Sequence, residues 1–224
     1  MNLVSPKIEV EQFKSKPIMK NIERAGRTCY RSEGIITKDS YKTFLPNIIK
    51  RGHESVLEHE KITVRLTCDV GVYKDLTRHR IASFSIESTR YCNYSKDKFG
   101  NEINFIEPIY CDDEAKFQIW LECMVGIQQC YNRMAELGAK PDELRMMLPH
   151  STAAQVVITA NIREWRHILQ LRAQKAAHPA VRQLMIPLLL YFKRRLPELF
   201  CDIEYDKEFP KEQYATVSVM KLDK

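Results

Sequence analysis

Glycine and proline are scarce in this chain of 224 residues, which contains 7 and 10 of them respectively. Their scarcity excludes collagen-like sequences, low-complexity sequences and long flexible linkers. Long apolar runs are missing as well, since the longest, at residues 188–192, is far shorter than the ~20 residues that cross a bilayer. The first residues carry no apolar signal-peptide stretch. We therefore expect a cytoplasmic protein with no membrane partner.

The cysteines also lack the spacing patterns that mark disulfide frameworks or metal sites. The 7 cysteines, an odd number, include no Cys-x-x-Cys pair and no spacing typical of metal ligands. In a reducing compartment such residues behave as small hydrophobic side chains. The sequence therefore predicts no disulfide framework and no metal site.

The surplus of positive charge is modest. Lys and Arg number 35 against 29 Asp and Glu, which is a formal net charge of +6. This balance favours anionic partners without distinguishing nucleic acids from small phosphorylated molecules. The hydrophobic share of 44% and the charged share of 29% are ordinary for a soluble globular protein. A chain of this length suggests one domain.

Hydrophobic periodicity predicts interleaved helices and strands. Strands are expected at residues 7–13, 60–68 and 152–159. Helices are expected from residue 17 onward and at residues 40–50, 112–137, 141–149, 161–174 and 179–196, the last with a kink near Pro187. We therefore expect an α/β or α+β layer fold in a single domain, 1–224, with a polar C-terminal tail from about residue 202.

Residues 78–91 are rich in arginine and hydroxyl side chains, and they also contain a histidine and one carboxylate. Guanidinium groups match phosphate and carboxylate oxygens in pairs, and hydroxyls and backbone amides complete a cradle for an anion. A solvated basic turn explains the composition of this stretch alone equally well.

Several strings in the chain occur together in one known family. Arg78-His79-Arg80, followed by Ser88 and Arg90-Tyr91, resembles the signature of the flavin-dependent thymidylate synthases. The stretches 52–59, 143–149 and 161–172 resemble three further elements of that family. They stand in the family's order and span roughly residues 25–185. Read with the periodicity, the resemblance leads us to expect an α/β fold similar to α+β, with a central, mostly antiparallel sheet flanked by long helices.

The resemblance implies a reaction. Enzymes of this family methylate dUMP to dTMP, taking the carbon from methylenetetrahydrofolate and reducing power from NADPH through FAD. They use no cysteine nucleophile, so Cys92, next to the motif, is interpreted as a spectator. The resemblance also implies a homotetramer whose active sites are shared between subunits.

The resemblance further implies a role for individual residues. The flavin contacts are Ser55, Arg78, His79, Arg80, Asn161, Ile162, Arg163 and His167. The nucleotide contacts are Asp75, Arg78, Glu87, Ser88, Thr89, Arg90, Arg145 and Arg172. Arg172 is the catalytic candidate, because a cation beside N3 and O2 of the pyrimidine stabilises charge that develops as C5 becomes nucleophilic. Without the motifs, arginines such as Arg163 and Arg172 read as the solvent face of an amphipathic helix.

The chain departs from the family pattern at two positions. Many members carry Gln where this chain has Asp75, which can accept a hydrogen bond from a ribose hydroxyl but cannot donate one. Position 86 is usually Glu or Gln, and Ile86 forms no hydrogen bond, so that contact is either absent or supplied by Glu87 or Ser85.

Two alternatives follow from these features. The departures suggest a degenerate member that binds flavin or nucleotide without turnover. The aromatics Tyr91, Tyr94 and Phe99, between Arg90 and Lys98, suggest a binder of single-stranded nucleic acid. The arginines form no continuous stripe, so we expect no nucleic-acid partner.

Overall fold

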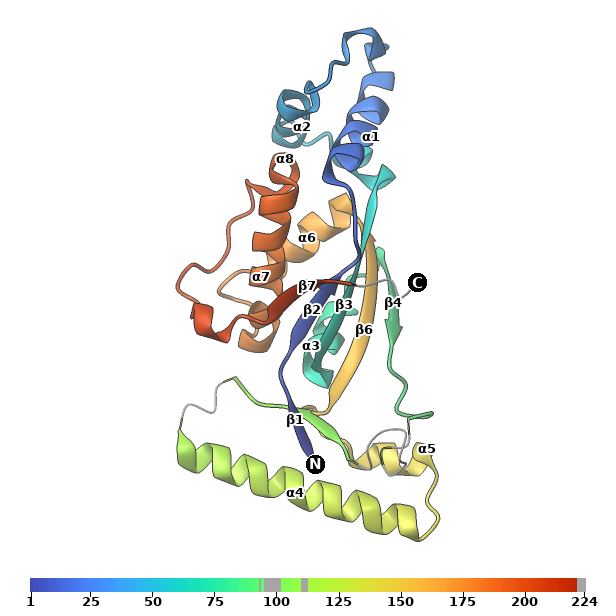
Figure 1. Ribbon diagram of the computed structural model, residues 1–224, viewed down its shortest axis with the longest axis vertical. Helices are drawn as coiled ribbons and strands as arrows, with labels where there is room; N and C mark the ends of the chain where they lie inside the picture. Colours follow the sequence, from blue (N-terminus) through green and yellow to red (C-terminus); the bar gives the residue numbers. More distant parts are fainter. Residues whose placement is uncertain (93, 95–101, 110–112, 221–224) are drawn as a thin grey trace. The chain divides into compact units, whose positions relative to one another are not determined.

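The computed structural model describes residues 1–92, 94, 102–109 and 113–220 (Figure 1). The positions Lys98, Phe99 and Asp112 named above lie outside the described residues. The chain divides into two compact units, each built from separate stretches of sequence. Unit 1 comprises Met1–Lys7, Leu66–Arg78 and Ser85–Val156, and unit 2 comprises Ile8–Arg65, His79–Phe84 and Val157–Lys224.

The mixed α/β class expected from the sequence is confirmed. The helices are α1 (Ser15–Thr28), α2 (Tyr41–Lys50), α3 (Val70–Leu76), α4 (Glu114–Glu136), α5 (Pro141–Leu144), α6 (Ile162–Arg172), α7 (Pro179–Arg195) and α8 (Pro197–Phe200). The strands are β1 (Asn2–Val4), β2 (Lys7–Val10), β3 (Lys61–Asp69), β4 (Ala82–Ile86), β5 (Asn104–Ile106), β6 (Ala153–Asn161) and β7 (Thr216–Val219). Short 3-10 turns occur at η1 (Glu33–Ile35), η2 (Glu54–His59), η4 (Arg145–Met147) and η5 (Lys211–Gln213).

The central sheet has five strands in the order β4-β6-β3-β2-β7, and a second sheet pairs β1 with β5 in parallel. Alternate residues of β3 are buried, which is the pattern of a strand with one face in a core. Within unit 2, Thr63 and Thr159 bring their Oγ1 atoms to 3.0 Å between the neighbouring strands β3 and β6.

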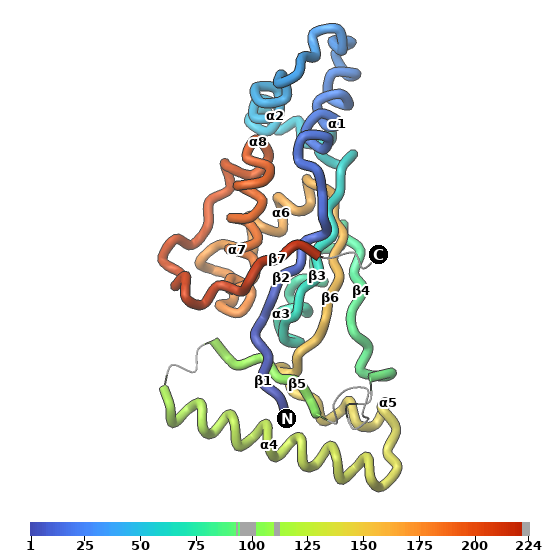
Figure 2. Tube along the Cα trace, in the orientation of Figure 1, coloured from blue at the N-terminus to red at the C-terminus, as the bar shows by residue number. Residues whose placement is uncertain are grey.

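In unit 2, α6 is attached to this sheet by its apolar side. Trp165 is fully buried and donates its Nε1–H to the carbonyl of Ile62 at 2.9 Å. Ile168 and Leu169 are buried on the same helix, and Figure 2 shows the helix running on from the end of β6. The polar residues of α6 therefore project from a helix whose position is set by its core contacts.

In unit 1, the long helix α4 has its own core. Met124 and Tyr131 of α4 pack with Phe105 and Leu144. The predicted helix over residues 112–137 is confirmed as α4, which Asp113 caps by accepting from the Ala115 N–H at 2.8 Å. Gly138 follows it with φ +85, a conformation that favours glycine and ends helices.

The structure differs from the sequence expectation in several places, and the strands β1, β4 and β5 are among the elements that the sequence did not predict. α3 was not predicted, because its sequence is short and Asp69, which caps it through the Val72 N–H at 2.8 Å, looks like the end of a strand. Pro187, where the sequence predicts a kink, lies inside α7. The stretch after residue 202, expected to be a polar tail, contains β7 and buries Ile203 and Phe209.

No helix within the described ranges is long and apolar enough to cross a bilayer.

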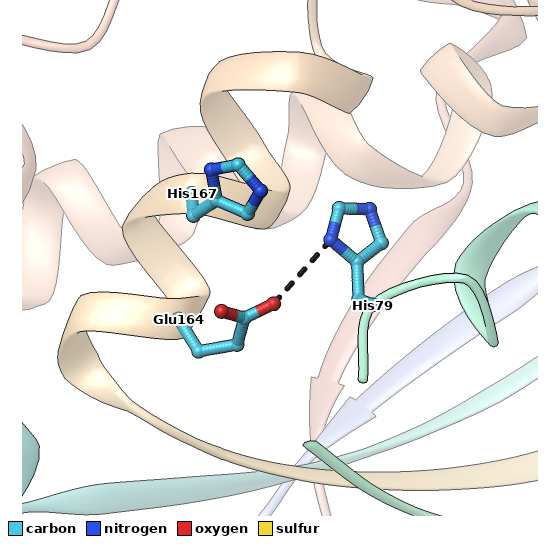
Figure 3. Close-up of side chains that lie close together, drawn as sticks. All are labelled: His79, Glu164 and His167. Carbon is cyan, nitrogen blue, oxygen red and sulfur yellow. Dashed lines mark ion pairs between the residues drawn. The ribbon is translucent and has the colours of Figure 1, made fainter. Parts of the chain in front are cut away.

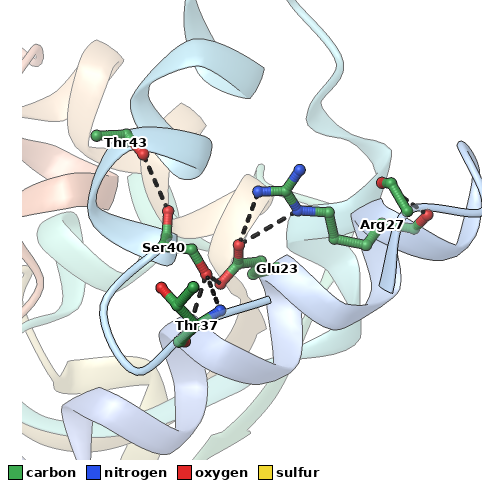
Figure 4. Close-up of polar contacts among 6 residues, drawn as sticks. Glu23, Arg27, Thr37, Ser40 and Thr43 are labelled. Carbon is green, nitrogen blue, oxygen red and sulfur yellow. Dashed lines mark hydrogen bonds and ion pairs between the residues drawn. The ribbon is translucent and has the colours of Figure 1, made fainter. Parts of the chain in front are cut away.

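A buried carboxylate organises the start of unit 2 (Figure 4). Glu23 of α1 is fully buried, and Arg27 donates to it through Nε at 3.3 Å and Nη2 at 3.1 Å. Ser40, just before α2, donates its hydroxyl to the other oxygen of Glu23 at 2.9 Å and accepts the Thr37 N–H at 2.9 Å. One side chain of α1 therefore holds the turn that begins α2.

We expect Glu23→Ala to lower the free energy of unfolding by about 3 kcal/mol, because it leaves the Arg27 charge without its partner. Glu23→Gln keeps an acceptor for Ser40 and should lose less. Urea denaturation measures both. Arg24→Ala, exposed on the same helix, is the control and should change little. Equal stability of Glu23→Ala and wild type would show that this network does not support the fold.

Candidate active site

A group of titratable side chains in unit 2 lies between the start of the 79–84 segment and α6 (Figure 3). His79 is 5% exposed, and its Nδ1 lies 3.4 Å from Oε1 of Glu164. Its ring packs edge-on against His167, with 5.5 Å between the ring centroids. Arg172, the last residue of α6, donates its Nε–H to Nε2 of His79 at 3.0 Å. Residues far apart in the sequence therefore form one cluster.

The start of helix α6 is fixed by a capping residue. Asn161 is its N-cap, and its side-chain oxygen accepts the backbone N–H of Glu164 at 2.8 Å. This cap satisfies a donor that the first turn of a helix leaves without a partner. It also orients the turn that carries Glu164.

The protonation state of His79 follows from its partners. Arginine has donors only, so Nε2 must accept from Arg172. The proton of a neutral ring is then on Nδ1, which faces Glu164. In the predicted flavin contact His79, Nε2 therefore accepts a hydrogen bond from Arg172, and Nδ1 lies close to Glu164.

The charge environment agrees with a neutral ring. Burial, with Arg172 and then His167 nearby, lowers the pKa of His79 from 6.5 to about 4. Burial raises the pKa of the Glu164 carboxyl, although His167 opposes that effect. The contact between Glu164 and His79 is therefore that of a carboxyl group with a neutral imidazole, rather than an ion pair.

The same cluster has the spacing of a metal site. Ligand atoms of His79, Glu164 and His167 lie within 4.8 Å of one another. The guanidinium of Arg172 disfavours a metal, because it already engages Nε2 of His79 and would stand beside a divalent cation. The absence of a metal remains our prediction.

An open hollow of about 400 Å³ lies beside the start of α6 in unit 2. Its lining includes Lys61, Arg80, Ser83, Thr159 and Asn161. Two cations, two hydroxyls and an amide form a donor set that suits a phosphorylated ligand, and the lining carboxylate Glu58 accepts a hydrogen bond from Arg163. The hollow brings together the predicted cofactor contacts Arg80 and Asn161.

The remaining predicted cofactor contacts have other surroundings. Ser55 is exposed in η2, Ile162 is buried in the core, and Arg78 is exposed at the end of a unit 1 segment. The guanidinium of Arg163 donates to Glu58 at 2.7 Å, whereas the ring of His167 packs against His79.

The predicted nucleotide contacts, apart from Arg172, belong to unit 1. Arg90 donates its Nε–H to Asp142 at 2.8 Å, and its backbone N–H lies 3.4 Å from the hydroxyl of Ser88. Arg145 is exposed in η4. The other members are partly exposed: Asp75 on α3 and Glu87 and Thr89 after β4.

The structure bears on the substitution at Ile86, which ends β4. Glu87, expected to replace its missing contact, accepts from the Tyr94 hydroxyl at 2.9 Å and from the Gln155 N–H at 3.3 Å. Burial and the Glu87 carboxylate raise the pKa of Tyr94, which keeps it a donor. Both oxygens of Glu87 are therefore engaged within unit 1.

Sequence reasoning missed Glu164, Lys61 and Thr159. Glu164 stands three residues after a helix cap, a position where Glu usually serves the cap itself. Lys61 and Thr159 lie on polar positions of strands, and only the pairing of β3 with β6 brings them to one hollow. Alternation along β3 marked the polar face of Lys61, but it could not name the neighbouring strand.

The comparisons with known proteins agree on the family. Residues 14–198 match the family described as "Thymidylate synthase complementing protein". A flavin-dependent thymidylate synthase of Geobacter sulfurreducens is 29% identical over 185 residues, covering 80% of this chain and 78% of the relative. One of Mycobacterium bovis is 32% identical over 208 residues, covering 82% of this chain and 78% of the relative.

Two solved structures share the fold. The UMP/dUMP methylase PolB of Streptomyces cacaoi, bound with 5-Br dUMP, has a TM-score of 0.75 at 20% identity and covers 89% of this chain and 95% of its own. Thymidylate synthase X of Helicobacter pylori, with FAD and dUMP, has a TM-score of 0.72 at 20% identity and covers 88% of this chain and 98% of its own. At these identities the likeness concerns the fold alone.

The lowered pKa of His79 predicts a pH dependence of stability. Between pH 6.5 and about 4 the unfolded state binds a proton at this residue that the folded state does not. Stability is therefore lost as the pH falls through that window. We expect urea titrations to show a steeper acid loss for wild type than for His79→Gln, whose side chain does not titrate. Parallel curves would mean that His79 is not held neutral.

Proposed function

This chain belongs to the family described as thymidylate synthase complementing protein, and from that premise we propose that it is a flavin-dependent thymidylate synthase, which converts dUMP to dTMP. The observation that carries the proposal is the family match over residues 14–198, which includes every residue of the His79 cluster. In the proposed reaction methylenetetrahydrofolate donates the carbon. FAD, when bound, supplies the reducing chemistry with electrons from NADPH.

The hollow beside α6 supports a flavin cofactor in this role. Lys61 and Arg80 would neutralise phosphate charge, and Ser83, Thr159 and Asn161 would donate hydrogen bonds. We assign the other predicted contacts, Ser55, Arg78, His79, Ile162, Arg163 and His167, to the same cofactor as proposals.

We assign the nucleotide to Arg172 and to the predicted unit 1 residues. The Arg172 guanidinium would lie beside N3 and O2 of the pyrimidine and stabilise the charge that develops there. Its Nε–H is held by His79. Ser88, Thr89, Arg90 and Arg145 would hold the phosphate. Arg90 would exchange its exposed partner Asp142 for that phosphate, an exchange that a weak surface pair allows.

We further propose a homotetramer in the cytoplasm, with active sites shared between its subunits. A chain of 224 residues must handle FAD, dUMP, a folate and NADPH, and shared sites would meet that demand. The degenerate-member and nucleic-acid-binding alternatives make different predictions for the same experiment.

The purified protein should show flavin absorbance, or acquire it with added FAD, and should release tritium from 5-labelled dUMP in the presence of methylenetetrahydrofolate and NADPH. UMP is the matched comparison substrate. Flavin absorbance without tritium release would support a degenerate member. A protein that neither carries nor takes up FAD contradicts both flavin functions and favours the nucleic-acid alternative.

Arg172→Ala should retain FAD while its rate of tritium release falls about 100-fold or more, because the proposed role concerns charge on the pyrimidine. Cys92→Ala is the control and should be close to wild type, since no cysteine nucleophile is proposed. Absorbance spectra and release rates measure both effects. Full activity of Arg172→Ala would rule out the assigned role.

The two roles of Asn161, as helix cap and as proposed cofactor contact, can be tested separately. Asn161→Asp keeps the oxygen that caps α6 but loses the amide donor and adds negative charge beside Lys61 and Arg80. We expect unchanged thermal stability and about tenfold weaker FAD binding, the size of one hydrogen bond to a charged group. Asn161→Ala should in addition lose about 1 kcal/mol of stability. Normal FAD affinity of Asn161→Asp would show that Asn161 caps the helix without contacting the cofactor.

A further inference from the structure

The proposed function does not explain the direction in which the Glu164 side chain points. Asn161 and Glu164 stand at the cap and third helical positions, where Glu usually turns back to the backbone N–H of the cap. Asn161 completes its half of this arrangement at 2.8 Å. The Glu164 carboxyl group is instead directed at Nδ1 of His79, at 3.4 Å, and only 7% of the residue is exposed (Figure 3).

The three side chains form a sequence of directed contacts. Arg172 can only donate to Nε2 of His79, so the ring's single proton belongs on Nδ1, opposite Glu164. A proton on Nε2 would set two donors against each other at a separation of 3.0 Å. The hydrogen bond from Arg172 to His79 thus depends on which nitrogen of His79 carries the proton.

We propose that Glu164 is a positioning residue for Arg172: by facing Nδ1 of His79 it keeps the ring proton there, and Nε2 stays available to hold the Arg172 guanidinium. This inference rests on the proposed function, in which Arg172 engages the pyrimidine. Because all three residues lie in unit 2 and two of them are on α6, a rigid helix sets the geometry.

The tautomer of His79 tests the inference without substrate. Nitrogen NMR of ¹⁵N-histidine-labelled protein at neutral pH distinguishes protonated from unprotonated ring nitrogens, and His79→Gln assigns the signal. In wild type we expect a proton on Nδ1 and none on Nε2. In Glu164→Met the buried Nδ1–H has no acceptor, and the Nε2 signal should change. A proton on Nε2 in wild type, or an unchanged signal in Glu164→Met, overturns the proposal.

Kinetics test the consequence for Arg172. Glu164→Met should release tritium from dUMP about 10- to 100-fold more slowly, the cost of a misplaced catalytic group, with its FAD content unchanged. Glu164→Gln offers an amide oxygen to Nδ1–H and should recover most of this loss. Gln170→Met, an exposed change on the same helix, should match wild type.

These outcomes distinguish a failure of the proposed function from a failure of the proposed role of Glu164. A wild-type protein without FAD or tritium release refutes the proposed function, whatever the tautomer of His79. An active wild type in which Glu164→Met is equally fast, or in which Glu164→Gln is as slow as Glu164→Met, refutes the role of Glu164.

Discussion

The hydrogen bond from Arg172 to a buried, neutral His79 is the interaction on which the candidate site depends. A protonated ring could not accept it, and burial beside a guanidinium makes protonation costly. Glu164 faces the opposite nitrogen. The cluster therefore positions a cation through a group that has no charge of its own.

That arrangement requires α6 to be held in place by contacts with the rest of unit 2. Trp165 anchors it to β3 from the core side, and Arg166 holds Asp202 through a paired hydrogen bond of 2.7 Å on each nitrogen. Asn161 completes its first turn. These contacts join the helix to segments distant in the sequence. A cluster built on such a helix is held more accurately than one built on loops.

Much of the fold could be predicted because local pattern and tertiary burial agree. The alternation along β3 and the apolar stripe of α4 were visible as strand and helix. α3 was missed because it is short and begins at a capped strand end, Asp69. The stretch after residue 202 read as polar, yet Ile203 and Phe209 are enough to pack it. Composition averages over a segment, whereas packing depends on single side chains.

The sequence by itself determined the fold class, the family and the residue types available for chemistry, because periodicity and motif strings are written along the chain. Only the tertiary structure decided which partners those residues have. His79 is expected from the sequence to contact a cofactor, and the fold adds that its ring nitrogens meet Arg172 and Glu164. Lys61 joined Arg80 and Asn161 through strand pairing. Hydrogen-bond direction and burial depend on positions in space, which spacing along a chain does not specify.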